Sequence, residues 1–176
     1  MPNMLNKNSD TPLQHQSAPE TPRTSSWAAL HRRPLTTKWS IALEDSFAGR
    51  IVKDDLQFVS QGPPVRTVWL AIWSPKDESI PETLDRIKLY VHPSPEQRFE
   101  EAGSDPDEWR YASWYPHVVN GRHQWGLYAY TVRQGSYVQA SFISDEPGDL
   151  EWALFTWRSL RYAAPPRDNG EPNEGI

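Results

Sequence analysis

The chain has 176 residues, no cysteine and a formal net charge of −5 at pH 7. The lack of cysteine excludes disulfides, thiolate metal sites and cysteine nucleophiles. Residues 39–162 carry twelve Lys and Arg against eighteen Asp and Glu, which argues against nucleic acid as a partner, because phosphate binding needs clustered positive charge.

The two ends of the chain differ in composition from the middle. Residues 1–26 and 163–176 are polar, proline-containing and without apolar periodicity, so we expect disordered tails. Residues 27–38 predict a short helix and a linker, and residues 39–162 a single domain large enough to fold alone. No apolar stretch is long enough to span a membrane, and no signal peptide is apparent. We therefore expect a cytoplasmic protein with no membrane partner.

The first half of the domain predicts three strands. Residues 38–44 alternate apolar and polar side chains, as a half-buried strand does. Residues 50–60 predict a second strand, interrupted by a bulge or a turn at Asp54 and Asp55. Residues 66–73 are apolar on both faces, which indicates a central strand.

Helical signals follow. Residues 79–82 form a capping box with proline in the first turn, and apolar side chains then recur at helical spacing to about Val91. A similar cap at 94–97 predicts a short second helix over 98–102.

Three further strands are predicted at 109–119, 124–133 and 136–144. The pairs Asn120-Gly121 and Gln134-Gly135 between them suit tight hairpin turns, because such turns need positive φ. Strands joined in this way must be antiparallel.

The last predicted element is a helix over 150–162. The order is then three strands, one or two helices, three strands and a helix, which predicts an α+β domain with an antiparallel sheet of about six strands covered by helices. This order over residues 39–162, with a helix ending in residues 157–162 after a hairpin, resembles the small α/β/α sandwich of the Mog1 and PsbP families and their uncharacterised bacterial relatives. The resemblance implies a non-catalytic binding or accessory domain and carries no site residues.

The Asn120-Gly121 turn decides the positions of two histidines. A two-residue turn pairs His117 with Gln124 and Val118 with His123, so the two imidazoles point to opposite faces and cannot bind one metal ion. One face of this hairpin gathers polar aromatic and charged side chains: Tyr115, His117, Arg122, Gln124, Tyr128 and Tyr130. Such a face either forms a binding surface or packs under a helix with its polar ends in water.

The tryptophans suggest two other contact sites. Trp152 and Trp157 are about 140° apart around a helix, so Trp152 is expected off the buried stripe, either as an exposed contact residue or resting on the preceding loop. Trp69 and Trp73 share a strand face with Ala71 between them. This arrangement either leaves a slot for a flat ligand or accommodates a side chain from a covering layer.

No catalytic or cofactor signature is present. The chain lacks a glycine-rich phosphate loop, a Gly-x-Ser-x-Gly elbow and a His-Glu-x-x-His helix, so we expect no cofactor and no metal, and we favour a non-enzymatic domain. Our first hypothesis is a protein-binding domain, such as an accessory, inhibitory or immunity-type factor. The alternative is a small-molecule-binding domain or modest enzyme with a pocket between sheet and helix, in which Arg122 would hold an anionic group. The partner and the oligomeric state stay open.

Overall fold

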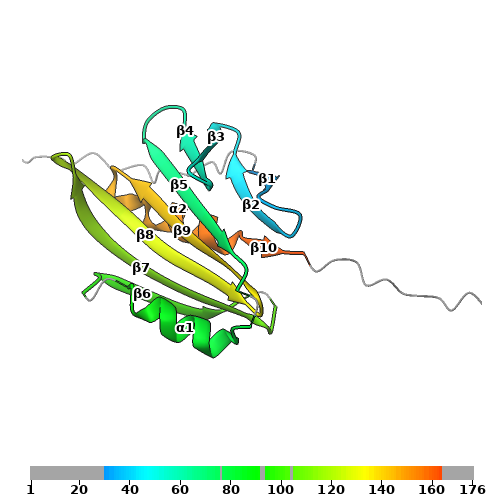
Figure 1. Ribbon diagram of the computed structural model, residues 1–176. Helices are drawn as coiled ribbons and strands as arrows, with labels where there is room; N and C mark the ends of the chain where they lie inside the picture. The colour runs from blue at the N-terminus through cyan, green and yellow to red at the C-terminus, as the bar shows by residue number, and fades with distance from the viewer. Residues whose placement is uncertain (1–29, 76, 92–93, 104, 164–176) are drawn as a thin grey trace, which may run out of the picture.

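A large antiparallel sheet dominates the protein. The computed structural model describes residues 30–75, 77–91, 94–103 and 105–163. The strands of the large sheet are β3 (Phe47–Val52), β4 (Asp55–Ser60), β5 (Arg66–Trp73), β6 (Gln97–Ala102), β7 (Glu108–Val119), β8 (Arg122–Arg133) and β9 (Ser136–Ser144). They lie in the order β3-β4-β5-β9-β8-β7-β6, and each neighbouring pair is antiparallel (Figure 1).

A second layer covers one face of this sheet. It consists of a three-stranded sheet in the order β1-β2-β10, formed by β1 (Leu30–Pro34), β2 (Trp39–Glu44) and β10 (Arg161–Tyr162), together with α2 (Leu150–Arg158) and the short 3-10 turn η1 (Pro147–Asp149) before it. In Figure 1, α2 lies behind β8 and β9, and β1 and β2 lie to the right of β5. The main core lies between the two layers. Two buried indoles tie it together, because Trp39 Nε1 donates to Ser136 Oγ at 2.9 Å and Trp157 Nε1 to Thr131 Oγ1 at 3.1 Å.

The opposite face of the large sheet is covered only in part, by α1 (Ile80–Lys88). The helix begins at a capping box, in which the Glu82 amide donates to the Ser79 hydroxyl and the Glu82 carboxylate accepts from the Ser79 amide. Ile87 anchors it in a smaller core made by side chains of β7, β8 and β9. In Figure 1, α1 lies in front of the β6–β8 side of the sheet.

Several predicted elements are confirmed. Strands β5 and β9 have the predicted bounds, and β5 lies inside the sheet between β4 and β9. The hairpin at Asn120-Gly121 has the predicted register, with His117 opposite Gln124, so the two histidines do lie on opposite faces. The predicted interruption of the second strand is the turn at Lys53 and Asp54, which have φ of 50° and 73°.

The predicted fold class was wrong. The protein is mainly β, with a seven-stranded sheet and a three-stranded sheet, and it is not a helix-covered α+β sandwich of about six strands. Residues 98–102 belong to the edge strand β6 instead of a helix, because all six residues of β6 pair with β7. The expected strand at 38–44 lies in the second sheet, where it pairs with β1 and β10.

Two predicted helices also differ. Residues 30–34 of the predicted helix at 27–38 form β1, and residues 27–29 lie outside the described residues. The last helix ends at Arg158, and Arg161 and Tyr162 pair with β2. Residues 1–26 and 164–176 of the predicted tails at 1–26 and 163–176 lie outside the described residues. Ala163 is described, and its amide donates to the Lys38 carbonyl at 2.8 Å. Within the described ranges, no helix is long and apolar enough to cross a membrane.

Candidate ligand-binding site

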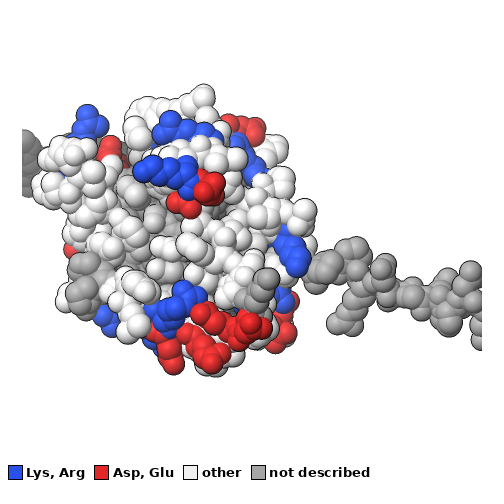
Figure 2. All heavy atoms as spheres, viewed as in Figure 1, with Lys and Arg blue, Asp and Glu red and all other residues white. Residues whose placement is uncertain are grey.

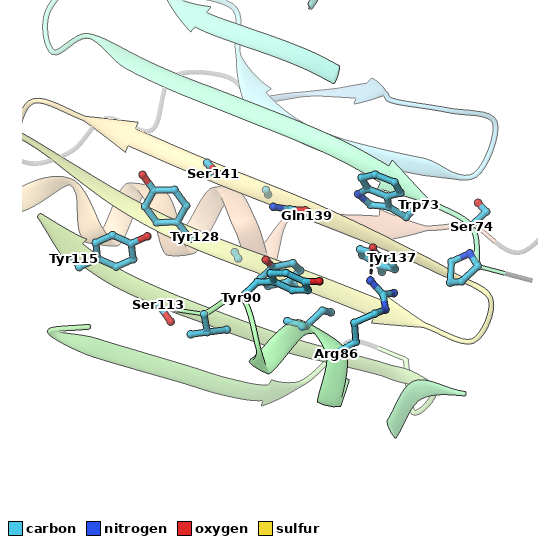
Figure 3. Close-up of a pocket in the computed structure, with 16 residues that line it drawn as sticks. Trp73, Ser74, Arg86, Tyr90, Ser113, Tyr115, Tyr128, Tyr137, Gln139 and Ser141 are labelled. Atoms are coloured by element: carbon cyan, nitrogen blue, oxygen red, sulfur yellow. Dashed lines mark hydrogen bonds between the residues drawn. The ribbon is translucent and has the colours of Figure 1, made fainter. Parts of the chain in front are cut away.

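A hollow of about 590 Å³ lies between the large sheet and α1. Its walls come from the end of β5, from α1 and the residues after it, and from β7, β8 and β9 (Figure 3). The lining residues are Trp73, Ser74, Pro75, Arg86, Ile87, Tyr90, Val91, Ser113, Tyr115, Tyr128, Ala129, Tyr130, Tyr137, Gln139, Ala140 and Ser141. A volume in this range is typical of small-molecule sites.

One end of the hollow is a pair of stacked phenol rings. Tyr115 and Tyr128 lie with ring centroids 4.7 Å apart and planes 14° from parallel. The His117 ring meets the Tyr128 ring edge-on at 5.9 Å. Gly126 makes this arrangement possible, because a Cβ atom there would lie 2.6 Å from a carbon of the Tyr128 ring. The glycine therefore lets the Tyr128 ring lie close to the strand.

The other end has a second aromatic pair. Trp73 stacks on Tyr137, with centroids 6.2 Å apart and planes 15° from parallel. Tyr90, just beyond the end of α1, lies between the two aromatic pairs in Figure 3. Its side chain is 75% exposed. A ligand in the hollow would therefore meet ring faces at both ends.

Arg86 is the one charged residue among those that line the hollow, and its charge is already paired. Its Nε and one terminal nitrogen donate to the two oxygens of Glu78 at 3.1 and 2.8 Å, and the other terminal nitrogen donates to the Tyr137 hydroxyl at 3.2 Å. Figure 2 shows charged side chains above and below a hollowed, uncharged centre on this face. The hollow therefore offers no unpaired charge to an anionic ligand.

Ser113 supplies an unused hydrogen-bonding group. Its side chain is 1% exposed and lines the hollow from β7, and its hydroxyl has no hydrogen-bond partner. A serine hydroxyl can both donate and accept, and leaving such a group buried without a partner is unfavourable. Because the oxygen itself is buried, a polar atom of a ligand would satisfy it only after a shift of the surrounding side chains.

Burial disfavours the charged forms of the tyrosines and of His117. It raises the pKa of Tyr128 to about 12, with a smaller contribution from neighbouring Tyr115. It also raises the pKa of Tyr115 and Tyr130 and lowers the pKa of His117, because a low-dielectric environment disfavours the charged form. The tyrosines are therefore hydroxyl donors and apolar surfaces, which suits binding.

The structure brings together only some of the predicted site residues. Tyr115, Tyr128 and Tyr130 line the hollow. His117 lies beside them, outside the lining. Arg122 is exposed next to the hairpin turn, also outside the lining, so it holds no group in the hollow.

The expectation that Trp152 lies off the buried stripe was wrong. Trp152 is 4% exposed and packs against Phe47 and Phe142, with the Arg66 guanidinium 4.8 Å from its ring centre. The reason is that three strands of the large sheet, β3, β5 and β9, supply the side chains around Trp152. The sheet therefore buries a wider arc of α2 than one stripe.

Other residues of the hollow were not predicted from the sequence, namely Arg86, Tyr90, Ser113, Tyr137 and Gln139. Strand alternation held a signal for some of them, because Gln139 pairs with Tyr130 and Ser113 pairs with Tyr128 on the same face. No sequence signal showed that α1 would cross this face.

Neither the comparison with protein-family models nor that with curated proteins found a match for this chain. The resemblance in element order to the Mog1 and PsbP families therefore stays a prediction. Among the residues that the structure describes, no three His, Asp or Glu side chains form a group that could hold a metal ion.

Proposed function

We propose that this domain binds a small, uncharged molecule with a flat ring in the hollow between α1 and the large sheet. The observation that carries the proposal is the buried, unpartnered hydroxyl of Ser113 in the wall of a cavity of about 590 Å³. Ligand sites typically combine apolar and aromatic walls with a few polar groups that fix orientation.

The lining defines the class of ligand. Ring faces at both ends, from Tyr115 and Tyr128 and from Trp73 and Tyr137, favour a flat aromatic or polycyclic group, because offset stacking adds to the gain from burial. The paired charge of Arg86 favours an uncharged ligand. Ser113 favours one hydroxyl, carbonyl or amide group at the β7 side.

The test uses two probes that differ in one group, 2-naphthol and 2-methylnaphthalene, titrated calorimetrically into the full chain. We expect both to bind saturably to the wild-type protein. Ser113→Ala should weaken 2-naphthol by roughly three- to tenfold, the equivalent of one hydrogen bond, and leave 2-methylnaphthalene unchanged. The matched control is Arg122→Ala, at a position outside the hollow, which should change neither affinity.

Two outcomes would contradict the proposal. One is the absence of saturable binding for both probes. The other is an equal loss of affinity for both probes in Ser113→Ala, since this would mean that the hydroxyl does not contact the polar group.

Protein binding stays a second hypothesis. The exposure of Leu89 at 81% and Tyr90 at 75%, side by side after α1, favours it, because neighbouring exposed apolar side chains often mark interaction sites. Against it, Trp152 is buried and the tyrosines line a hollow instead of a flat surface. Native co-purification of the full chain and of a Leu89→Ser, Tyr90→Ser variant would bear on it. The cytoplasmic location stays a prediction from the sequence.

A further inference from the structure

A second hollow, of about 280 Å³, adjoins the first on the same face of the sheet. Its lining comes from β4, β5 and β9, and it shares Trp73, Gln139 and Ser141 with the larger hollow. It contains the two tryptophans of β5 that share a face, Trp69 and Trp73. The residues that line only the second hollow, among them Asp55, Trp69 and Ala71, have no part in the proposed function.

The second hollow is a box centred on Ala71. Along β5, Trp69 and Trp73 lie on either side of this alanine. Their Cα atoms are roughly 13 Å apart, the length of four residues of extended chain. Across the strands, Ala71 pairs with Gln139 of β9. On the other side lies Asp55 of β4, because the following residue, Leu56, pairs with Leu70. The groups around this box are therefore the methyl group of Ala71, the two indoles, the carboxylate of Asp55 and the amide of Gln139.

The indole walls are available to a ligand. Trp73 is 50% exposed, and Tyr137 stacks against it from β9. The small side chain of Ala71 leaves the space between the two indoles unfilled. None of the residues that line this hollow comes from α1, the helix on this face of the sheet. The alternative that a side chain from a covering layer packs between Trp69 and Trp73 therefore finds no support in this lining.

The charge of the box is negative. Asp55 is the one charged residue in the lining. The nearby cation Arg50 lies on β3, one strand farther from Ala71, and its Nε donates to Gln57 Oε1 at 2.5 Å. Lys53 lies in the turn before β4, outside the lining.

We infer that this second hollow binds a small organic cation, an alkylated ammonium group held between Trp69 and Trp73 and opposite Asp55. Indole is the aromatic side chain that attracts cations most strongly, through the negative potential over its face. Asp55 supplies the opposite charge, and the amide oxygen of Gln139 can accept from a hydroxyl or ammonium hydrogen. Trp73 and Gln139 line both hollows, but Trp69, Ala71 and Asp55 line only the second one, and they distinguish it from the larger hollow, whose lining suits an uncharged ligand.

The experiment compares choline with its uncharged isostere 3,3-dimethylbutan-1-ol, each titrated into the full chain and followed by NMR signals of the tryptophan side chains. Choline should bind saturably and shift the Trp69 and Trp73 signals, and the isostere should bind about tenfold more weakly because it lacks the cation–π and ionic attraction. Ala71→Leu, which fills the floor, should abolish choline binding and leave 2-naphthol binding unchanged.

A matched pair of variants isolates the carboxylate. Asp55→Asn should weaken choline by about fivefold, the loss of one partly solvated ion pair. Asp54→Asn removes the same charge from the neighbouring turn residue, which lies outside the lining and has a φ of 73° that asparagine accepts, and it should leave the affinity unchanged. The inference is overturned if choline does not bind saturably, if the isostere binds equally well, or if Asp55→Asn is no weaker than Asp54→Asn.

Discussion

At the scale of single residues, Ser113 and Ser136 differ in whether the hydroxyl has a hydrogen-bond partner. The Ser113 hydroxyl is buried without a partner in the wall of the hollow. The hydroxyl of Ser136, also buried, accepts from Trp39 Nε1 at 2.9 Å and donates to the Trp73 carbonyl at 3.2 Å. The same side chain therefore stabilises the fold at one position and adds a desolvation penalty at the other.

This contrast gives the first prediction. Ser113→Ala should leave the free energy of unfolding unchanged or raise it by up to about 1 kcal/mol, because it removes an unsatisfied buried hydroxyl. Ser136→Ala should lower it by about 1–3 kcal/mol, because it leaves the Trp39 indole N–H buried without an acceptor. Urea unfolding of the two variants beside the wild type measures both changes. A loss of stability in Ser113→Ala as large as that in Ser136→Ala would mean that the Ser113 hydroxyl is not free for a ligand.

At the scale of secondary-structure elements, α1 forms one wall of the candidate site, and two carboxylates hold it, Glu82 at its first turn and Glu78 through Arg86 in its last turn. The hydrogen bonds from Arg86 lower the pKa of Glu78 below its ordinary value of 4.5, and those from Ser79 lower the pKa of Glu82. A lowered pKa in the folded state means that the stabilisation is present above pH 4.5 and is lost as the pH falls through the folded-state pKa. Acid should therefore loosen α1.

The second prediction follows from this linkage. Between pH 6 and pH 3.5, amide protection factors in α1 should fall in the wild-type protein more than those in β8. Glu78→Gln should already show lowered protection at pH 6 and a smaller further fall, because its side chain cannot lose a charge. The control is Asp85→Asn, at an exposed carboxylate of the same helix, which should keep the wild-type pH profile. Equal pH profiles in all three proteins would rule out this role for Glu78.

The elements also show what sequence patterns can decide. The capping box of α1 and the apolar run of β5 are local signals. β5 has the predicted bounds and α1 begins where it was predicted, but α1 ends at Lys88 and not near Val91. The local signal before β6 was misleading, because the cap pattern at 94–97 predicted a helix over 98–102 and residues 97–102 form a strand. Pairing with β7 decided the outcome. Tertiary contacts outweighed local preference there.

At the scale of the whole molecule, the candidate site depended on information that no single segment contains. The hairpin register placed Tyr115, Tyr128 and Tyr130 on one face correctly, because side chains alternate along a strand. The turn at Gln134-Gly135 also predicted the pairing of β8 with β9. No sequence pattern showed that β9 would pair with β5 as well, which places Trp73 beside Tyr137. The burial of Trp152 was missed for a similar reason, since it depends on side chains from three separate strands of the large sheet, β3, β5 and β9.

The joint between the two layers is where loss of a single group should affect the whole molecule most. Arg66 of β5 makes two hydrogen bonds, at 2.9 and 2.7 Å, to the carboxylate of Asp149, which precedes α2 and also accepts from Ser144 Oγ. Burial alone would raise the pKa of Asp149, but the hydrogen bonds from Arg66 and Ser144 outweigh it and hold the pKa below its ordinary value. The carboxylate therefore stays charged to low pH and keeps β5, β9 and α2 connected.

Asp149→Asn should lower the free energy of unfolding by about 2–3 kcal/mol, because it leaves the Arg66 guanidinium largely buried with a weaker partner. The loss should stay below that of a fully buried pair, since Glu44 lies 3.6 Å from Arg66. The control is Glu101→Gln, which breaks the more exposed pair with Arg158 and should cost less than about 1 kcal/mol. Urea unfolding at pH 7 measures both variants. Equal losses would show that the interlayer pair contributes no more than a surface ion pair, and that apolar packing alone joins the layers.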